Sequence, residues 1–347
     1  MARRGVSTWE PPVQATGFVY KVDYSSMTMH RILSAFILVV VCIAIFPALP
    51  ALAQTDPRTA RDHIIRLSED IWGRLAGSAN ERRAADYIES VLTELGYAAT
   101  RQAFMFAPED RDRSNRLESV NIIAVKRGQT AREIIVGAHF DSEVRGRCAG
   151  DNAFGVAVML EAAAAIQGPH TPYTVRFVAF GAEEQGFGGS RYFVSQMTPE
   201  AIGNTVAMIN LDSVIAGDRA YVYGDAGEAG FLRDWLLGKA RDEGLPLETQ
   251  TSENPQYPSG TTGDFSDHVP FREAGVPYAY FESTNWSLGD LDGYTQVDAQ
   301  LGEDGEIWHT RFDTLAYLDE NCPGRIDARL ALFNRMLYRA LTEFTAS

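Results

Sequence analysis

The order of apolar and polar positions along the chain predicts strands that alternate with helices. Apolar residues recur at helical spacing over 56–71 and 80–95, and short apolar runs typical of buried strands follow. Predicted strands cover 120–125, 133–136, 174–180, 206–211, 220–223 and 278–281, and further helices cover 152–166, 229–243, 267–274 and 324–344. This alternation predicts an α/β fold in which helices cover both faces of a mostly parallel sheet.

A secretory signal peptide is predicted ahead of this pattern. Arg31 precedes an apolar run over 32–46, and Ala51-Leu-Ala53 follows as a cleavage signal. The run is short for a transmembrane anchor, which needs about 20 residues, and two prolines follow it. We therefore expect residues 1–53 to be a signal peptide with an N-terminal extension and 54–347 to be one folded domain. The protein would be secreted or periplasmic, with no stable membrane association after cleavage.

Net charge and cysteine content bear on two further properties, the binding of nucleic acid and the formation of a disulfide. A net charge of −15 over 347 residues argues against nucleic-acid binding, because no basic surface would neutralise the phosphates. Cys148 and Cys322 remain after removal of the signal peptide. In an exported chain they form either one disulfide or two buried free thiols, and the sequence leaves both alternatives open.

Side chains that bind metals follow several of the predicted strands. His139, Glu183, Glu184 and Asp212 each stand just beyond a strand. Open α/β sheets bind ligands at the carboxyl ends of their strands, so these side chains are expected to meet there. Imidazole and carboxylate groups are ligands that zinc takes in proteins. The pattern predicts a zinc site at this edge of the sheet.

The spacing also suggests individual roles. Asp141 can accept the other N–H of the His139 imidazole and fix its tautomer. Asp151 is placed to bridge two zinc ions, the alternative being a plain helix N-cap. Adjacent Glu183 and Glu184 repel one another unless cations are close, so one can bind metal while the other acts as general base; the alternative is an exposed acidic turn.

Two ligand sets complete this prediction. One zinc would take His139, Asp151 and Asp212, and the other would take Glu184, Asp151 and His309.

At this point the chain resembles the twenty-eighth family of metallopeptidases, the co-catalytic di-zinc aminopeptidases, over roughly residues 56–345. The resemblance implies a zinc-exopeptidase-like domain with a central mixed sheet, and two Zn²⁺ ions held by His139, Asp151, Glu184, Asp212 and His309. It implies hydrolysis at the N-termini of peptides through a metal-bridging water, with Glu183 as base. The matching segments are Ala138-His-Phe-Asp141, Gly150-Asp-Asn-Ala-Phe-Gly155, Gly181-Ala-Glu-Glu184, Gly189-Ser-Arg-Tyr-Phe193, Asn210-Leu-Asp212, Ser266-Asp-His-Val-Pro-Phe271, His309-Thr310 and Asp313-Thr314.

The chain departs from this family in two places. Some relatives carry a tyrosine at the Ser-Asp-His segment that supports the tetrahedral intermediate, and 263–268 contains none. His268 is a candidate for that contact, or it packs and caps a helix with Asp267. The acidic stretch 285–306 lines the pocket, binds calcium or is a solvated loop.

Two other functions stay open at this stage. Trp308-His309-Thr310 resembles the pattern of glutaminyl cyclases, which use a similar fold with one zinc. A non-catalytic domain that kept the fold is the other alternative, although such a domain is expected to have lost ligands.

Overall fold

The computed structural model describes residues 57–108 and 116–346. The predicted signal peptide, its apolar run and its cleavage site lie outside the described residues. Within the described ranges, no helix is both long and apolar enough to cross a membrane.

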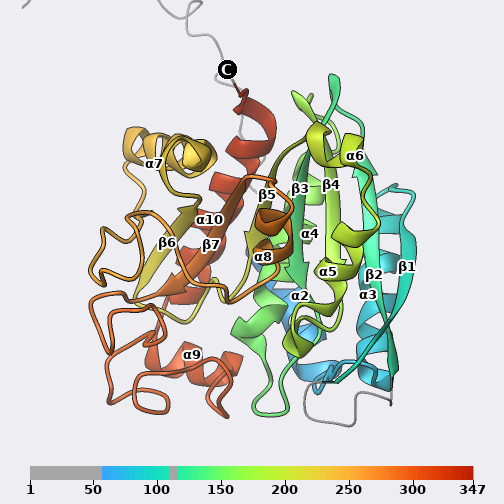
Figure 1. The fold of residues 1–347 in the computed structure, drawn as a ribbon. Helices are drawn as coiled ribbons and strands as arrows, with labels where there is room; N and C mark the ends of the chain where they lie inside the picture. The colour runs from blue at the N-terminus through green and yellow to red at the C-terminus, as the bar shows by residue number, and fades with distance from the viewer. Residues whose placement is uncertain (1–56, 109–115, 347) are drawn as a thin grey trace, which may run out of the picture. The chain divides into compact units, whose positions relative to one another are not determined.

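A seven-stranded mixed sheet in the order β1-β2-β4-β3-β5-β7-β6 forms the centre of the fold (Figure 1). The middle strands β4, β3, β5 and β7 pair in parallel, and the remaining pairs are antiparallel. All strands except β2 and β6 therefore run in the same direction. The strands are β1 (Thr100–Phe106), β2 (Leu117–Lys126), β3 (Thr130–His139), β4 (Tyr173–Phe180), β5 (Thr205–Leu211), β6 (Arg219–Gly224) and β7 (Tyr278–Thr284).

Helices cover both faces of the sheet (Figure 1). One face carries α2, α3, α4, α7 and α10, and the other carries α5, α6 and α8. The helices are α2 (Pro57–Ile65), α3 (Ala79–Glu94), α4 (Phe154–Ala165), α5 (Gly188–Ser195), α6 (Pro199–Asn204), α7 (Phe231–Glu243), α8 (His268–Glu273), α9 (Leu315–Asn321) and α10 (Arg325–Glu343). Short π and 3-10 turns are η1 (Arg66–Asp70), η2 (Ala149–Ala153), η3 (Glu183–Gln185) and η4 (Gly227–Gly230).

The core follows from the alternation of side chains along the strands. In β3, Ile134 and Val136 pack in the large core beside α4, whereas Ile135 packs in the smaller core that includes Phe271 of α8. Burial on both faces explains why this strand is almost wholly apolar. A Cβ atom on Gly137 would come within 2.8 Å of both Phe180 and Met208 side chains, so close packing favours glycine there.

The predicted fold class is confirmed, and every strand and helix named from the sequence is present. The pattern missed β1, α5, α6 and α9. The first strand alternates weakly and keeps four exposed residues out of seven. The three helices have 8, 6 and 7 residues, which is too short to show a clear helical period.

The structure decides between the two states of the cysteines. Cys148 and Cys322 are both buried and neither is bonded to the other. The disulfide alternative is therefore not present in the structure.

Candidate metal centre

The carboxyl ends of β3, β4 and β5 bring most of the predicted ligands to one edge of the sheet. His139 is the last residue of β3, and Glu183 and Glu184 open the turn η3 just after β4. Asp212 follows β5 directly. Since parallel strands end at the same edge, these side chains converge although 73 residues separate the first from the last.

Asp151 and His309 reach the same edge from connecting segments. Asp151 lies in η2, before α4, with φ −118° and ψ 91°. Its peptide bond to Asn152 is cis. The residue that caps α4 is Ala153, so the N-cap alternative for Asp151 does not apply. His309 comes from the loop between β7 and α9.

Two groups of side chains have the composition predicted for the two zinc ions. Possible ligand atoms of His139, Asp151 and Asp212 lie within 4.8 Å of one another, and so do those of Asp151, Glu184 and His309. Asp151 belongs to both groups. Its Oδ1 lies 3.0 Å from His139 Nε2, and its Oδ2 lies 3.0 Å from His309 Nε2. One carboxylate therefore faces both histidines, which is the geometry that a bridging ligand requires.

The remaining distances complete these groups. His139 Nε2 lies 3.4 Å from Asp212 Oδ1, and His309 Nε2 lies 3.3 Å from Glu184 Oε2. All of these side chains are buried except that of His309, which is 53% exposed. One group is therefore more accessible to solvent than the other.

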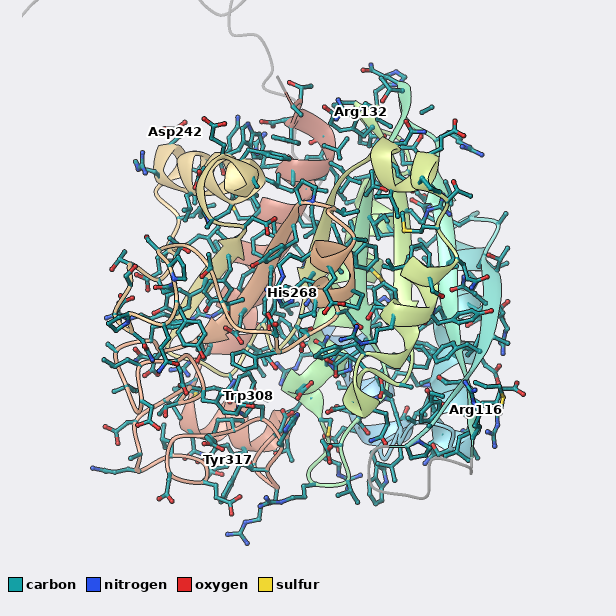
Figure 2. The ribbon with its side chains drawn as sticks, in the orientation of Figure 1. Arg116, Arg132, Asp242, His268, Trp308 and Tyr317 are labelled. Atoms are coloured by element: carbon teal, nitrogen blue, oxygen red, sulfur yellow. The ribbon has the colours of Figure 1, made fainter. Side chains whose placement is uncertain are left out.

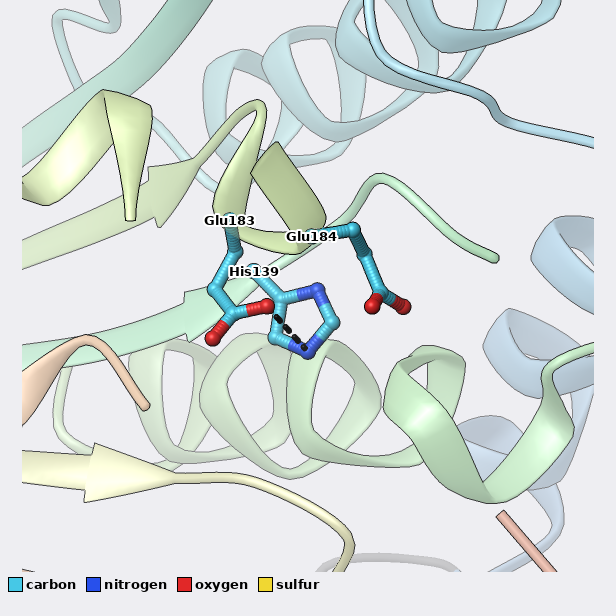
Figure 3. Close-up of side chains that lie close together, drawn as sticks. All are labelled: His139, Glu183 and Glu184. Carbon is cyan, nitrogen blue, oxygen red and sulfur yellow. Dashed lines mark ion pairs between the residues drawn. The ribbon is translucent and has the colours of Figure 1, made fainter. Parts of the chain in front are cut away.

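Glu183 projects toward the His139 ring, and Glu184 lies on the other side of that ring (Figure 3). Glu183 Oε2 is 4.0 Å from His139 Nε2. Glu183 also forms a third group of potential metal ligands with His139 and Glu184. Its assignment as the general base therefore stays a prediction. It is buried, so the alternative of an exposed acidic turn does not hold for this residue.

Asp141 holds the two glutamates in place through their backbone. Its Oδ1 accepts the N–H of Glu183 at 3.0 Å and its Oδ2 accepts that of Glu184 at 3.2 Å. The predicted contact with the other ring nitrogen of His139 is longer, at 3.5 Å. Sequence reasoning found the residue but not its main partners, because those bonds join β3 to the turn after β4.

The electrostatics show an excess of buried negative charge. Burial raises the pKa of Glu183 well above its ordinary value, partly opposed by His139. Burial also raises the pKa of Glu184 to about 8. Burial lowers the pKa of each histidine, but the surrounding carboxylates outweigh it, and the pKa of His309 rises to about 12. Four carboxylates thus meet two imidazoles in a largely buried site, and these residues fit divalent cations.

A second observation supports that fit. Glu184 Oε1 is buried and has no hydrogen-bond partner among the described residues. A metal ion held by Glu184 would give this orphaned carboxylate oxygen the partner that a buried polar atom needs.

Residues outside the predicted set also support the site. Arg74 is fully buried and donates to the carbonyl oxygens of Leu67, Phe140 and Cys148 at 2.7, 2.7 and 3.1 Å. Asp313 accepts the N–H groups of Gly150 and Asp151 at 2.6 and 3.0 Å. Sequence reasoning missed Arg74, since a lone arginine near a helix carries no signal of burial.

Several residues beside the ligands have left-handed backbone conformations without being glycine. They include Ala182 before Glu183 (φ 53°), Ser213 after Asp212 (φ 50°) and His309 itself (φ 53°). Such conformations cost on the order of 1 kcal/mol or more each and concentrate where a site must be held in shape.

A cavity of about 510 Å³ opens onto the cluster. Aromatic side chains form part of its wall, and Tyr294 contacts both Phe265 and Trp308 at ring-centroid distances of 5.3 and 5.2 Å. The lining residues are Asp151, Glu183, Glu184, Gly186, Phe187, Arg191, Asp212, Ser213, Asp264, Phe265, Tyr280, Tyr294, Trp308 and His309.

The acidic stretch 285–306 and His268 differ in their position relative to the cavity. Tyr294 of the acidic stretch lines the cavity, so this segment is part of the pocket wall. Within 285–306, no group of ligands suited to a metal is found. His268 is not among the lining residues and lies fully buried against the rings of Tyr278 and Tyr280. It lies nearer the middle of the sheet than Trp308 does (Figure 2). In this position it packs at the start of α8, and its proposed contact with a reaction intermediate finds no support.

Comparison with known proteins now decides the family. The sequence profile of Peptidase family M28 matches residues 121–333. This chain belongs to Peptidase family M28. The enzyme class predicted from the sequence, a zinc-dependent aminopeptidase-like hydrolase, is confirmed by this membership and by relatives that are named aminopeptidases. A non-catalytic domain is correspondingly disfavoured.

Curated relatives of this M28 chain come from several bacteria. It is 32% identical over 282 residues to the alkaline phosphatase isozyme conversion protein of Escherichia coli, covering 74% of this chain and 81% of the relative. It is 30% identical to the aminopeptidase YwaD of Bacillus subtilis, covering 58% of this chain and 41% of the relative. The match to YwaD thus spans less than half of that longer protein.

Solved structures share the fold. A zinc aminopeptidase from Bacillus subtilis superimposes with a TM-score of 0.67 at 20% identity, covering 84% of this chain and 97% of the other. A glutaminyl cyclase from Porphyromonas gingivalis superimposes with a TM-score of 0.64 at 22% identity, covering 83% and 100%. At these identities the similarity establishes the fold and does not separate the two activities.

Proposed function

We propose that this M28 protein is an exported aminopeptidase that binds two zinc ions and removes the N-terminal residue from peptides. One observation carries the proposal: the two oxygens of Asp151 face one histidine each, so that a single carboxylate belongs to both ligand groups. Asp151, His139 and Asp212 would hold one ion, and Asp151, Glu184 and His309 the other.

Bound zinc ions in such a site polarise a carbonyl group and lower the pKa of water. The chain's own residues supply the remaining functions. Glu183, at the cavity wall, takes a proton from the attacking water and returns it to the amine that leaves. Asp141 accepts the backbone N–H groups of Glu183 and Glu184 and so holds both carboxylates in position near His139.

The charge of the cavity suits a substrate with a free N-terminus. Apart from the candidate ligands, Asp264 adds a carboxylate to the lining, and Arg191 is the basic residue there. Arg191 Nη1 lies 2.9 Å from Glu273 Oε2, so its charge is partly compensated. The cavity therefore favours a cationic α-amino group on electrostatic grounds.

The test compares a peptide with its N-acetylated form. Stepwise release of free amino acids from the first and none from the second is the expected result. Equal cleavage of both peptides would reject aminopeptidase action, since it would show that the free amino group is not recognised.

Glutaminyl cyclase activity is a second candidate because Trp308 lines the cavity beside His309. The same assay can include a peptide that starts with Gln. Pyroglutamate formation without peptide-bond cleavage, together with one tight zinc equivalent, would favour the cyclase over the aminopeptidase.

Export with cleavage after Ala53 remains part of the proposal. It is supported by Arg31, the apolar run over 32–46 and the Ala51-Leu-Ala53 signal. N-terminal sequencing of the exported product should begin at Gln54. Recovery of the uncleaved chain from the membrane fraction would contradict it.

A further inference from the structure

A buried carboxyl group lies behind the cavity wall without a basic partner. Glu282 of β7 is 2% exposed. Its Oε2 accepts the hydroxyl of Tyr223 at 2.8 Å, and its Oε1 accepts that of Tyr280 at 3.1 Å. Trp286 Nε1 donates in turn to the Tyr223 hydroxyl at 2.7 Å. Among the described residues, no basic side chain forms an ion pair with Glu282, so phenol hydroxyls are its hydrogen-bond partners.

The sheet explains how these residues meet. Tyr280 and Glu282 are two positions apart on β7 and therefore point to the same face. Tyr223 is the direct cross-strand partner of Tyr280 in the antiparallel pair of β6 and β7. The two tyrosines thus approach one carboxyl group from neighbouring strands.

The two tyrosines differ in one respect. Tyr280 lines the catalytic cavity, whereas Tyr223 is not among the lining residues. When Tyr280 donates its hydroxyl proton to Glu282, the lone pairs of the same oxygen stay available to accept a hydrogen bond. Tyr280 is 1% exposed, and Glu282 fixes the direction of its hydroxyl beside the cavity.

We propose that Tyr280, oriented by Glu282, accepts a hydrogen bond from the free α-amino group of the substrate. The inference rests on the proposed aminopeptidase function and identifies how its substrate is recognised. In this role Tyr280 contacts the substrate, and Glu282 is a positioning residue that acts through Tyr280.

Electrostatics favour a cation at this place. Burial raises the pKa of Glu282 to about 8, so a negative charge on this carboxyl is costly in the free protein. A cationic amino group bound to Tyr280 would offset that cost, because it stabilises the ionised carboxyl behind the phenol. The same arrangement gives no advantage to a ligand whose amino group is missing or acylated.

The experiment compares two ligands that differ in the amino group alone. Leucine hydroxamate and 4-methylpentanohydroxamate share the side chain and the metal-binding group. Their dissociation constants are measured by calorimetry on zinc-loaded protein, for the wild type, Tyr280→Phe, Glu282→Gln and the matched control Tyr223→Phe. The quantity of interest is the ratio of the two constants, which cancels effects common to both ligands.

The wild type should prefer the amino ligand, and Tyr280→Phe should reduce that preference by about tenfold or more, as expected for a hydrogen bond to a charged group. Glu282→Gln should reduce it as well. Tyr223→Phe removes a hydroxyl from the same carboxyl but not from the cavity, so it should keep the ratio within about twofold.

An unchanged ratio in Tyr280→Phe would overturn the inference, and so would an equal loss in Tyr223→Phe. Should Tyr280→Phe fail to fold, the ratio in Glu282→Gln decides in the same way. Calorimetry needs no turnover, so a fall in the ratio without any peptide hydrolysis would reject the aminopeptidase function and leave amine recognition intact.

Discussion

Two buried acidic regions adjoin each other at the end of this sheet, and their charges are handled differently. In the metal centre, four carboxylates converge on two histidines. Behind the cavity wall, the single carboxyl of Glu282 is held by the hydroxyls of Tyr223 and Tyr280. Asp212 belongs to the first region and its charge adds to the burial that raises the pKa of Glu282.

The difference teaches how a fold can keep acidic groups inside. Neutral hydrogen-bond donors are enough for one carboxyl, which can keep its proton. They are not enough for four carboxylates within a few ångströms, because the repulsion among them needs positive charge from bound ions. The first region should therefore depend on metal and the second on pH.

Removal of the shared ligand should have the largest effect on the first region. Asp151→Asn leaves the shape of the side chain but removes the charge that both ligand groups share. We expect zinc content to fall from about two equivalents to one or fewer, zinc affinity to fall by at least ~10²-fold, and peptidase activity to be lost. Metal analysis after dialysis against a weak chelator measures the first two changes.

A wild-type protein that holds one tight equivalent and is fully active would contradict the two-ion site. Addition of excess zinc to the variant serves as the control, since it separates weak binding from a misfolded site.

Exchange of Glu183 should have a smaller effect that leaves the metal in place. Glu183→Gln keeps the size of the side chain but cannot take a proton, so turnover should fall by about 10²–10⁴-fold with zinc content unchanged. Glu184→Gln is the matched control and should lose zinc as well. Near-normal turnover in Glu183→Gln would remove this residue from the role of base.

Stability against pH tests the second region. The folded pKa of Glu282, about 8, lies above the ordinary value of 4.5, so the folded chain holds a proton that the unfolded chain has released between these values. Stability from the neutral carboxyl is therefore fully present below pH ~4.5 and is lost as pH rises toward 8. Glu282→Gln lacks this titration and should gain stability relative to the wild type over that interval.

Each unit of difference between the folded and unfolded pKa is worth about 1.4 kcal/mol. Denaturant unfolding of both zinc-loaded proteins at pH 5 and pH 8 measures the effect. A constant difference in the free energy of unfolding at the two pH values would mean that Glu282 does not titrate abnormally.

The smallest effect is expected in the acidic stretch beside the cavity. Glu303 is exposed and pairs with Arg145, and exposed pairs contribute at most about 1 kcal/mol. Glu303→Gln should leave the melting temperature and kcat/KM nearly unchanged. Tyr294→Ala in the same stretch should raise KM, because Tyr294 lines the cavity. A strong loss of activity in Glu303→Gln would show that the charges of this stretch matter after all.

Sequence reasoning could find the metal centre but not the Glu282 network. His139, Glu183 and Asp212 each follow a predicted strand closely, and one general rule places such strand ends together. Tyr280 and Tyr223 also lie in predicted strands, but only the pairing of β6 with β7 makes them neighbours. An apolar run containing tyrosine gives no sign of which hydroxyl will face a cavity.

The same limit applies to His268 and to β1. The sequence leaves open whether His268 contacts a reaction intermediate or packs at a helix, and in the structure it lies fully buried against the rings of Tyr278 and Tyr280. The strand β1 was missed because its residues alternate weakly. In both cases the deciding contacts are made by segments distant in sequence.

Arg74 gives the metal centre a mechanical link to the beginning of the domain. Its guanidinium joins the carbonyl of Leu67, in the turn after α2, to those of Phe140 and Cys148, which flank the segments carrying Asp141 and Asp151. Zinc binding and the folding of α2 are expected to be coupled through this link, and each then favours the other by the same coupling free energy, because thermodynamic coupling is reciprocal. Zinc should therefore slow hydrogen exchange of backbone amides in α2 even though no residue of that helix is a candidate ligand. In Arg74→Met, the same amides should exchange at a rate that no longer responds to zinc.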